Sequence, residues 1–169
     1  MHRILIAFAL VLALALPLPA SAETVTGLPV IVDGDSLRFP GTDVRLEGID
    51  APEWDQSCQR NGATYQCGQE ATAALRALIA GRPVTCVGVP QKNGTERDIY
   101  GRLLAECRAG DTLINARMVE GGHALAFRRY SVEYVPQEDR ARAAGVGLWA
   151  GPHGAPWDWR RAKKVGRKD

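Results

Sequence analysis

Acidic residues in two short segments have the spacing of a site that binds a cation or activates water. Asp33 and Asp35 flank a glycine in a turn signal, although an Asp-Gly pair alone usually has only a structural role. Asp50 and Glu53 follow an apolar segment, and Pro52 between them must end a strand because proline has no N–H to donate. The side chains at 50 and 53 are therefore expected at a strand end, where they can converge on one site.

Two arginines accompany these carboxylates. Arg45 interrupts an otherwise apolar segment, and Arg102 begins another segment of strand character directly after a glycine. Either arginine alone could form an ordinary structural ion pair. On an extended backbone Asp98, Tyr100 and Arg102 point the same way, because side chains alternate with a period of two. The combination, rather than any single residue, indicates a site.

Carboxylates with paired arginines match the requirements of phosphodiester hydrolysis. A hard divalent cation held by carboxylate oxygens would neutralise and orient the phosphate. A further carboxylate would position or deprotonate a water molecule. Two guanidinium groups would hold the phosphate oxygens as negative charge builds in the transition state. A glycosidase also needs two carboxylates, but it would not explain the arginines.

Short strands and a few helices must position these residues. Alternating and apolar segments between turns predict strands at 25–32, 36–39 and 44–49, forming a β-meander, and at 84–89 and 103–108. Apolar residues at helical spacing predict helices at 69–80, from 113 to about 120, and from about 133 to 144. The expected fold is mainly β with α (class α+β), a small Greek-key barrel with helical additions.

The two ends of the chain differ in composition from the middle. Residues 1–22 have a basic start, an apolar run and an Ala-Ser-Ala end, which predicts a secretory signal peptide; a retained membrane anchor is the alternative. Residues 23–156 are expected to form one domain, and 157–169 a basic C-terminal tail that is either solvated or a tether to phosphate. The net charge of +2 neither supports nor excludes a nucleic acid partner.

Four cysteines follow the expected signal peptide, so disulfides are the default in an exported chain. Three pairings are possible. We favour Cys58–Cys67, which closes a short loop, and Cys86–Cys107, which would lie opposite each other in antiparallel strands. A zinc site lacks the close cysteine spacing that such sites need.

The sequence resembles the staphylococcal-nuclease-like (thermonuclease) family. Three motifs carry the resemblance, and their order and spacing match over essentially all of residues 23–156: Val32-Asp33-Gly34-Asp35-Ser36, Val44-Arg45-Leu46-Glu47-Gly48-Ile49-Asp50-Ala51-Pro52-Glu53, and Asp98-Ile99-Tyr100-Gly101-Arg102. The resemblance implies a five-stranded oligonucleotide-binding (OB) Greek-key barrel with about three helices. It also implies calcium-dependent cleavage of DNA, RNA or both, with low sequence specificity and 3′-phosphate products.

The resemblance assigns a role to each motif residue. Asp35, Asp50 and the carbonyl of Ala51 would bind Ca²⁺, Glu53 would act on the attacking water, and Arg45 and Arg102 would hold the phosphate. The substrate-binding surface would comprise Asp98, Tyr100, Arg128 and Tyr130. Three departures from the family pattern are Ala51 in place of a threonine, Ile99 in place of a basic residue, and Arg128 in place of a nucleotide-contacting tyrosine.

Several expectations remain for the structure and for comparison to test. The alternative function is a non-catalytic nucleic-acid-binding OB module, since this fold also serves for binding alone. His123 and His153 could suggest a histidine-based hydrolase, but each follows a glycine-rich break that favours a surface or packing role. We expect an exported monomer, periplasmic or extracellular, without stable membrane association once the signal peptide is removed.

Overall fold

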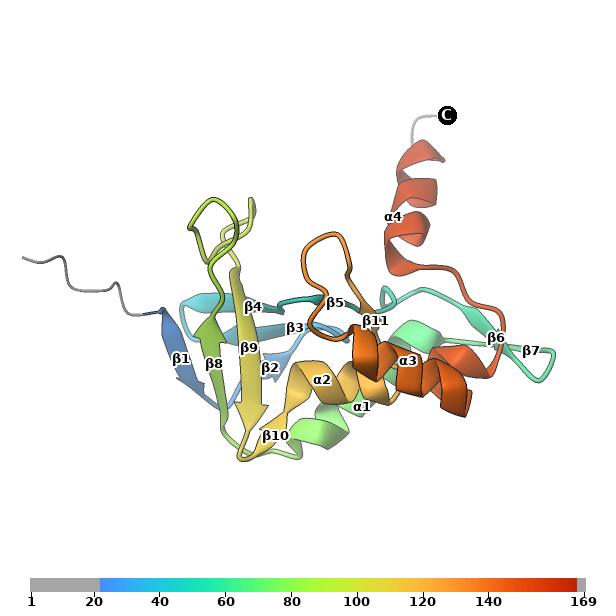
Figure 1. Cartoon of the computed structure of the whole chain (residues 1–169), viewed down its shortest axis with the longest axis horizontal. Coiled ribbons are helices and arrows are strands. Elements are labelled where there is room, and N and C mark those ends of the chain that lie inside the picture. Colours follow the sequence, from blue (N-terminus) through green and yellow to red (C-terminus); the bar gives the residue numbers. More distant parts are fainter. Residues whose placement is uncertain (1–21, 167–169) are drawn as a thin grey trace, which may run out of the picture.

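The computed structural model describes residues 22–166, so the expected signal peptide lies almost wholly outside the described residues. Its main sheet has seven strands, in the order β1-β8-β9-β4-β3-β2, with β10 paired to β9 (Figure 1). These strands are β1 (Thr24–Gly27), β2 (Val30–Ile31), β3 (Ser36–Phe39), β4 (Thr42–Leu46), β8 (Val84–Gly88), β9 (Leu103–Ala109) and β10 (Thr112–Leu113). Two small ribbons pair β5 (Ile49–Asp50) with β11 (Leu125–Ala126), and β6 (Cys58–Arg60) with β7 (Ala63–Tyr65).

The main sheet is curled because its two edges come from adjacent parts of the chain. β1 and β2 lie at opposite edges, although only Leu28 and Pro29 separate them. A flat sheet of six strands would be about 24 Å wide at the usual strand spacing. Three Cα–Cα steps reach at most about 11 Å. The single strand expected over 25–32 is therefore wrong: its first half pairs with β8 and its second half with β3.

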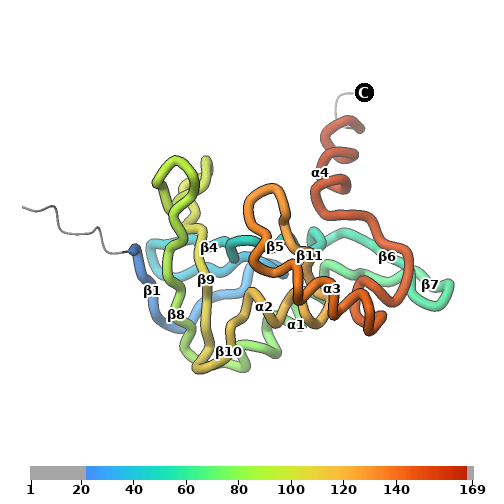
Figure 2. The backbone as a smooth tube through the Cα atoms, viewed as in Figure 1, coloured from blue at the N-terminus to red at the C-terminus, as the bar shows by residue number. Residues whose placement is uncertain are grey.

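Four α-helices occur within residues 22–166: α1 (Cys67–Ile79), α2 (Ile114–Glu120), α3 (Val135–Ala144) and α4 (Pro156–Val165), with a short 3-10 helix at Gly147–Ala150. The first three coincide with the helices expected from apolar spacing. The fourth lies in the segment expected to be a tail, and the tube in Figure 2 shows it standing away from the other helices. The chain is thus a mixed α+β protein with a curled half-barrel sheet, consistent with an OB-like fold, but the expected count of five strands and three helices is wrong.

The core lies between the curled sheet and the first two helices. α1 contributes Ala71, Leu75 and Ile79, which share one face at a spacing of four residues. The helix α2 is fixed to the sheet by buried Asn115, which accepts a hydrogen bond from the Cys107 N–H at 3.0 Å and donates to main-chain carbonyls. No helix in the described part of the chain is both long enough and apolar enough to cross a bilayer.

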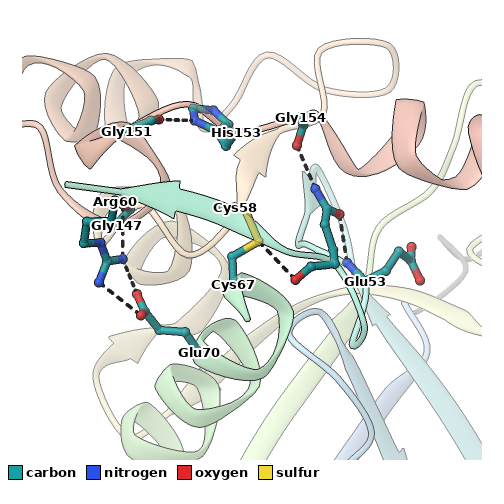
Figure 3. Close-up of a disulfide and its surroundings, with 10 residues drawn as sticks. Glu53, Cys58, Arg60, Cys67, Glu70, Gly147, Gly151, His153 and Gly154 are labelled. Carbon is teal, nitrogen blue, oxygen red and sulfur yellow. Dashed lines mark hydrogen bonds and ion pairs between the residues drawn. A yellow bond between two sulfur atoms is a disulfide. The ribbon is translucent and has the colours of Figure 1, made fainter. Parts of the chain in front are cut away.

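Both expected disulfides are present. Cys86 and Cys107 are directly opposite in the antiparallel pair β8–β9, as the register argument predicts. Cys58–Cys67 joins the β6–β7 hairpin to the start of α1 (Figure 3). At the beginning of the described chain, the main-chain N–H of Glu23 donates to the Glu96 carboxylate at 2.8 Å, and the Glu23 carboxylate forms an ion pair with Arg97.

Candidate active site

A groove of about 970 Å³ runs across one face of the molecule. The loop that joins β8 to β9 and the helix α4 both project toward the upper side of Figure 1, and both contribute lining residues. Residues from both of these segments line it, together with the end of β4, the 51–53 loop and the segment 127–130. The groove therefore brings together segments that are far apart in the sequence, including all three motifs.

Close packing fixes the turn at Asp33-Gly34-Asp35. A Cβ at Gly34 would lie 2.8 Å from the Cβ of Ala51 and 2.9 Å from that of Ala71, so only glycine allows the turn to approach both. The N–H of Ala51 donates to Asp35 Oδ2 at 2.9 Å. These contacts hold Asp35 against the 50–53 loop, and they connect the first two motifs directly.

Arg45 joins the two expected metal ligands. Its Nη2 lies 3.0 Å from Asp35 Oδ2 and 2.6 Å from Asp50 Oδ1, while Nη1 donates to Asp35 Oδ1 at 3.2 Å. Since a single nitrogen contacts both carboxylates, Asp35 and Asp50 are close enough to share one cation. The Asp50 side chain is fully buried, beneath groove-lining residues rather than on the groove surface.

Strand register places the two arginines on the same face of the sheet. Arg45 is the partner of Leu104 in the parallel pair β4–β9, and Arg102 lies two residues before Leu104. All three residues line the groove. The Asp98 carboxylate accepts hydrogen bonds from Arg102 Nε at 2.8 Å and from the main-chain N–H groups of Tyr100 and Arg102. Asp98 thus holds Arg102 in place across the tight turn.

The position of Glu53 depends on the start of α1. A Cβ at Gly68 would lie 1.8 Å from the Glu53 carbonyl oxygen, so the loop can pack there only against glycine. The buried Gln56 accepts a hydrogen bond from the Glu53 N–H at 3.2 Å and donates to the Gly154 carbonyl at 2.8 Å. The Cys58–Cys67 disulfide and the Arg60–Glu70 ion pair then secure the adjoining hairpin to α1 (Figure 3).

A third guanidinium, that of Arg160 from α4, also enters the site. Its Nη1 donates to Glu53 Oε1 at 2.6 Å and to Asp50 Oδ1 at 3.0 Å, and its Nη2 donates to Asp50 Oδ2 at 2.6 Å. Two further contacts hold α4 beside the groove. The Trp157 ring stacks on Phe127 with centroids 5.4 Å apart, and Lys163 forms an ion pair with Asp55.

Burial and charge shift the ionisation of the acidic groups. Burial, with the nearby charge of Asp35, raises the pKa of Asp33 to about 6. Burial also raises the pKa of Asp50, and the hydrogen bonds from Arg160 offset only part of this effect. Burial opposes the charge of Arg45, but the carboxylates of Asp35 and Asp50 outweigh it and keep the arginine pKa above its usual value. The site is therefore a desolvated cluster of opposite charges.

The donor set suits a hard cation. Asp35 and Asp50 offer carboxylate oxygens within reach of one nitrogen, and calcium binds six to eight such oxygens, main-chain carbonyls and water included. Within residues 22–166, no three His, Cys, Asp or Glu side chains form a ready-made metal cluster. Calcium bound here would therefore take its remaining oxygens from the main chain and from water, for which the neighbouring Ala51 carbonyl is the expected protein source.

The structure divides the expected substrate-binding residues into two groups. Tyr100 and Tyr130 are exposed and line the groove. Arg128, in contrast, forms an ion pair with the buried Glu138 at 2.6 Å, and Arg129 is the arginine of this segment that lines the groove.

Sequence reasoning missed the contribution of α4. The residues of α4 that line the groove are Trp157, Arg160, Arg161 and Lys164. Their spacing of three, four and seven residues from the first defines one helical face, and Pro156 is a typical first residue of a helix. Both signals are present in the sequence, but the six basic residues in the segment 157–169 favoured the prediction of a basic tail.

Comparison with known proteins identifies the family of this chain. A model of the family "Staphylococcal nuclease homologue" matches residues 43–151. The chain is 33% identical to an uncharacterized endonuclease of Haemophilus influenzae, covering 80% of this chain and 72% of that protein. It is 33% identical to the succinoglycan biosynthesis protein ExoI of Rhizobium meliloti, covering 76% of this chain and 66% of that protein.

A third relative is the probable staphylococcal-like nuclease CAN2 of Oryza sativa subsp. japonica, at 34% identity over 75% of this chain. The match spans only 31% of the length of that plant protein. The matched family region ends before α4, so Arg160 comes from outside it. On the extent of the family match and the identity to the Haemophilus endonuclease, this chain belongs to the staphylococcal nuclease homologue family.

Proposed function

We propose that this protein is a calcium-dependent phosphodiesterase, an endonuclease that hydrolyses DNA, RNA or both with low sequence specificity and leaves 3′-phosphate ends. The observation that supports this most is that Arg45 bridges Asp35 and Asp50 beside the same groove that Glu53 and Arg102 line. Membership of a nuclease family adds independent support.

In the proposed reaction each residue acts on the phosphate or on water. Asp35, Asp50 and the Ala51 carbonyl would hold calcium, which supplies positive charge to neutralise and orient the phosphate. Glu53 would accept a proton from the water whose oxygen attacks phosphorus. Arg102, with Arg45, would donate N–H groups to the non-bridging oxygens as their charge increases. Cleavage of the bond from phosphorus to the 5′ oxygen leaves the phosphate on the 3′ oxygen.

The remaining groove residues would bind the nucleic acid on either side of the reacting phosphate. We propose that Tyr100 and Tyr130 stack against bases or sugars, since aromatic faces bind nucleotides without sequence preference. We assign backbone contact to Arg129 in place of Arg128, because Arg128 is engaged with Glu138. Asp98 then acts as a positioning residue for Arg102 rather than as a contact to substrate.

We also propose that the chain works after export, as a monomer in the periplasm or outside the cell. The two disulfides suit an oxidising compartment. Removal of residues 1–22 would leave the domain that carries the groove, without stable association with a membrane.

Cleavage assays with the processed, oxidised protein test this function. Plasmid DNA, single-stranded DNA and RNA would be incubated with calcium, or with a chelator, and the chemistry of the product ends determined. Calcium-dependent cleavage to 3′-phosphate ends is the expected result. Glu53→Ser and Arg102→Ala should each lower kcat/KM by about 100-fold or more, because each removes a group that acts in the transition state.

Arg108→Ala is a matched control for Arg102→Ala. Arg108 is on β9, which begins directly after Arg102; it is half exposed and pairs with Glu106 outside the groove. Its replacement should leave the cleavage rate within about twofold, as expected for an exposed ion pair. Nucleic acid binding without any calcium-dependent cleavage would instead favour the non-catalytic binding module.

A further inference from the structure

The Asp50 carboxylate is fully buried beneath two guanidinium groups. Its Oδ1 accepts hydrogen bonds from both Arg45 and Arg160, and its Oδ2 accepts one from Arg160. A carboxylate has about four lone-pair positions, so three of those on Asp50 are already engaged. Any metal ion that binds Asp50 must compete for these oxygens.

The two guanidinium groups differ in how they are held. Arg45 extends from the central strand β4 and contacts Asp35 as well, so it belongs to the fixed framework of the site. Arg160 extends from α4, and Pro156 is the one buried residue of that helix. Trp157, in the first turn of α4, packs against a core cluster, so movement of the following turns, which carry Arg160, leaves the core covered.

Arg160 also links Asp50 to Glu53. The same Nη1 atom contacts both carboxylates, and this position between two anionic oxygens is one that a divalent cation would favour. The helix is kept nearby by the linker that precedes it, because Gln56 donates to the Gly154 carbonyl and the Gln59 N–H donates to the Pro152 carbonyl at 3.0 Å. The chain thus supplies its own cation to the site, from a helix tethered at its base.

We propose that Arg160 is a tethered cation that competes with the divalent metal for Asp50 and Glu53, so that α4 must leave the carboxylates for the metal to bind. This inference rests on the proposed calcium site. It assigns to α4, which lies outside the family match, control over metal binding. Metal binding is then coupled to release of the helix, because the metal can bind only when the ion pairs of Arg160 with Asp50 and Glu53 are broken.

Calorimetric titration of the processed protein with calcium chloride, without nucleic acid, tests this competition. Arg160→Ala should tighten calcium binding about tenfold or more, because charge-assisted hydrogen bonds to Asp50 no longer have to be broken. Arg161→Ala is the matched control: it removes the same charge from the next residue of α4, whose side chain is exposed and pairs with Asp158. It should change the calcium dissociation constant by less than about twofold.

Hydrogen exchange of the wild-type chain gives a second readout that needs no variant. Amides of 157–165 should exchange faster when calcium is added, since α4 is released. Equal calcium affinity in wild type and Arg160→Ala, or slower exchange in α4 with calcium, would overturn the competition while leaving a calcium-dependent nuclease intact. Weaker calcium binding in Arg160→Ala would also overturn it and would favour Arg160 as a supporting residue of the metal site. Absence of calcium binding in both proteins would overturn the proposed metal site and this inference together.

Discussion

At the scale of single residues, the Asp98 carboxylate orients the guanidinium of Arg102. It accepts two main-chain N–H groups and the side chain of Arg102, so the guanidinium is already oriented along the groove. Burial acts to raise the pKa of Asp98, but the hydrogen bonds from Arg102 outweigh it and the pKa lies below its ordinary value. Orientation of this kind lowers the entropy that must be lost when the transition state forms.

Replacement of Asp98 should therefore affect both stability and activity. Asp98→Asn should lower the free energy of unfolding at pH 7 by about 1 kcal/mol and lower kcat by about tenfold, with little change in KM. Because the folded-state pKa is depressed, the stability from this pair is present above about pH 4 and is lost as the pH falls below it. Urea unfolding of wild type and variant at pH 7 and near pH 3 measures this.

The exposed pair of Arg38 and Asp43 provides the control. Asp43→Asn should change the free energy of unfolding by less than about 0.5 kcal/mol. A stability difference between wild type and Asp98→Asn that stays constant, or grows, as the pH falls to about 3 would contradict the account given for Asp98.

At the scale of elements, the Cys58–Cys67 disulfide connects three parts of the site. It joins the β6–β7 hairpin to the start of α1 (Figure 3), where Gly68 supports Glu53. The Gln59 N–H of the hairpin in turn donates to the Pro152 carbonyl in the linker before α4. The cysteine spacing predicted this short loop, and the helix pattern predicted α1. The docking of the linker could not be predicted, because Gln56 and Gly154 are 98 residues apart in sequence.

Removal of this disulfide should destabilise the protein and loosen α4. Replacement of both cysteines by alanine should lower the free energy of unfolding by about 2–3 kcal/mol, the value expected for a closed loop of this length. Thermal and urea unfolding measure the loss, and hydrogen exchange should show faster opening of 151–165 than in the wild type. Unchanged exchange in that segment, despite lower stability, would mean that the hairpin does not hold α4.

At the scale of the whole molecule, cations line both ends of the groove. Lys92 lies on the loop between β8 and β9, and Arg161 and Lys164 lie on α4. The net charge of the chain is only +2, so attraction of a polyanion depends on this placement. Composition alone could not have indicated it.

Substitutions at the two ends of the groove should change the salt dependence of binding. Binding of a labelled single-stranded oligonucleotide, followed by fluorescence anisotropy with chelator present, should weaken steeply as salt increases. Lys92→Gln and Lys164→Gln should each reduce the slope of log K against log salt by about 0.7, the value for loss of one phosphate contact on a single strand. Arg76→Gln, an exposed cation of α1 outside the groove, should leave the slope unchanged. Equal slopes in all variants would show that the nucleic acid binds elsewhere.

Features of the fold and site could be predicted from the sequence where they depend on contacts between residues close together in the chain. The strands β8 and β9, and the bridge between Cys86 and Cys107, follow from local alternation and register. The division of segment 25–32 into two strands depends on closure of the sheet. The position of Arg160 in the active site depends on a contact with Asp50, which is 110 residues away in the sequence. Patterns of a few residues carry no information about such distant pairs.

The contact between Glu23 and Glu96 gives the expected processing site a physical consequence. Cleavage after Ala22 would convert the Glu23 amide, which now donates one hydrogen bond to the Glu96 carboxylate, into a free α-amino group. That group is largely protonated at neutral pH, and it would face a carboxylate already in place. Removal of the signal peptide would then add a positive charge at the base of the loop that carries Asp98 and Arg102. The new N-terminus would form an ion pair with Glu96 and stabilise the substrate-binding loop.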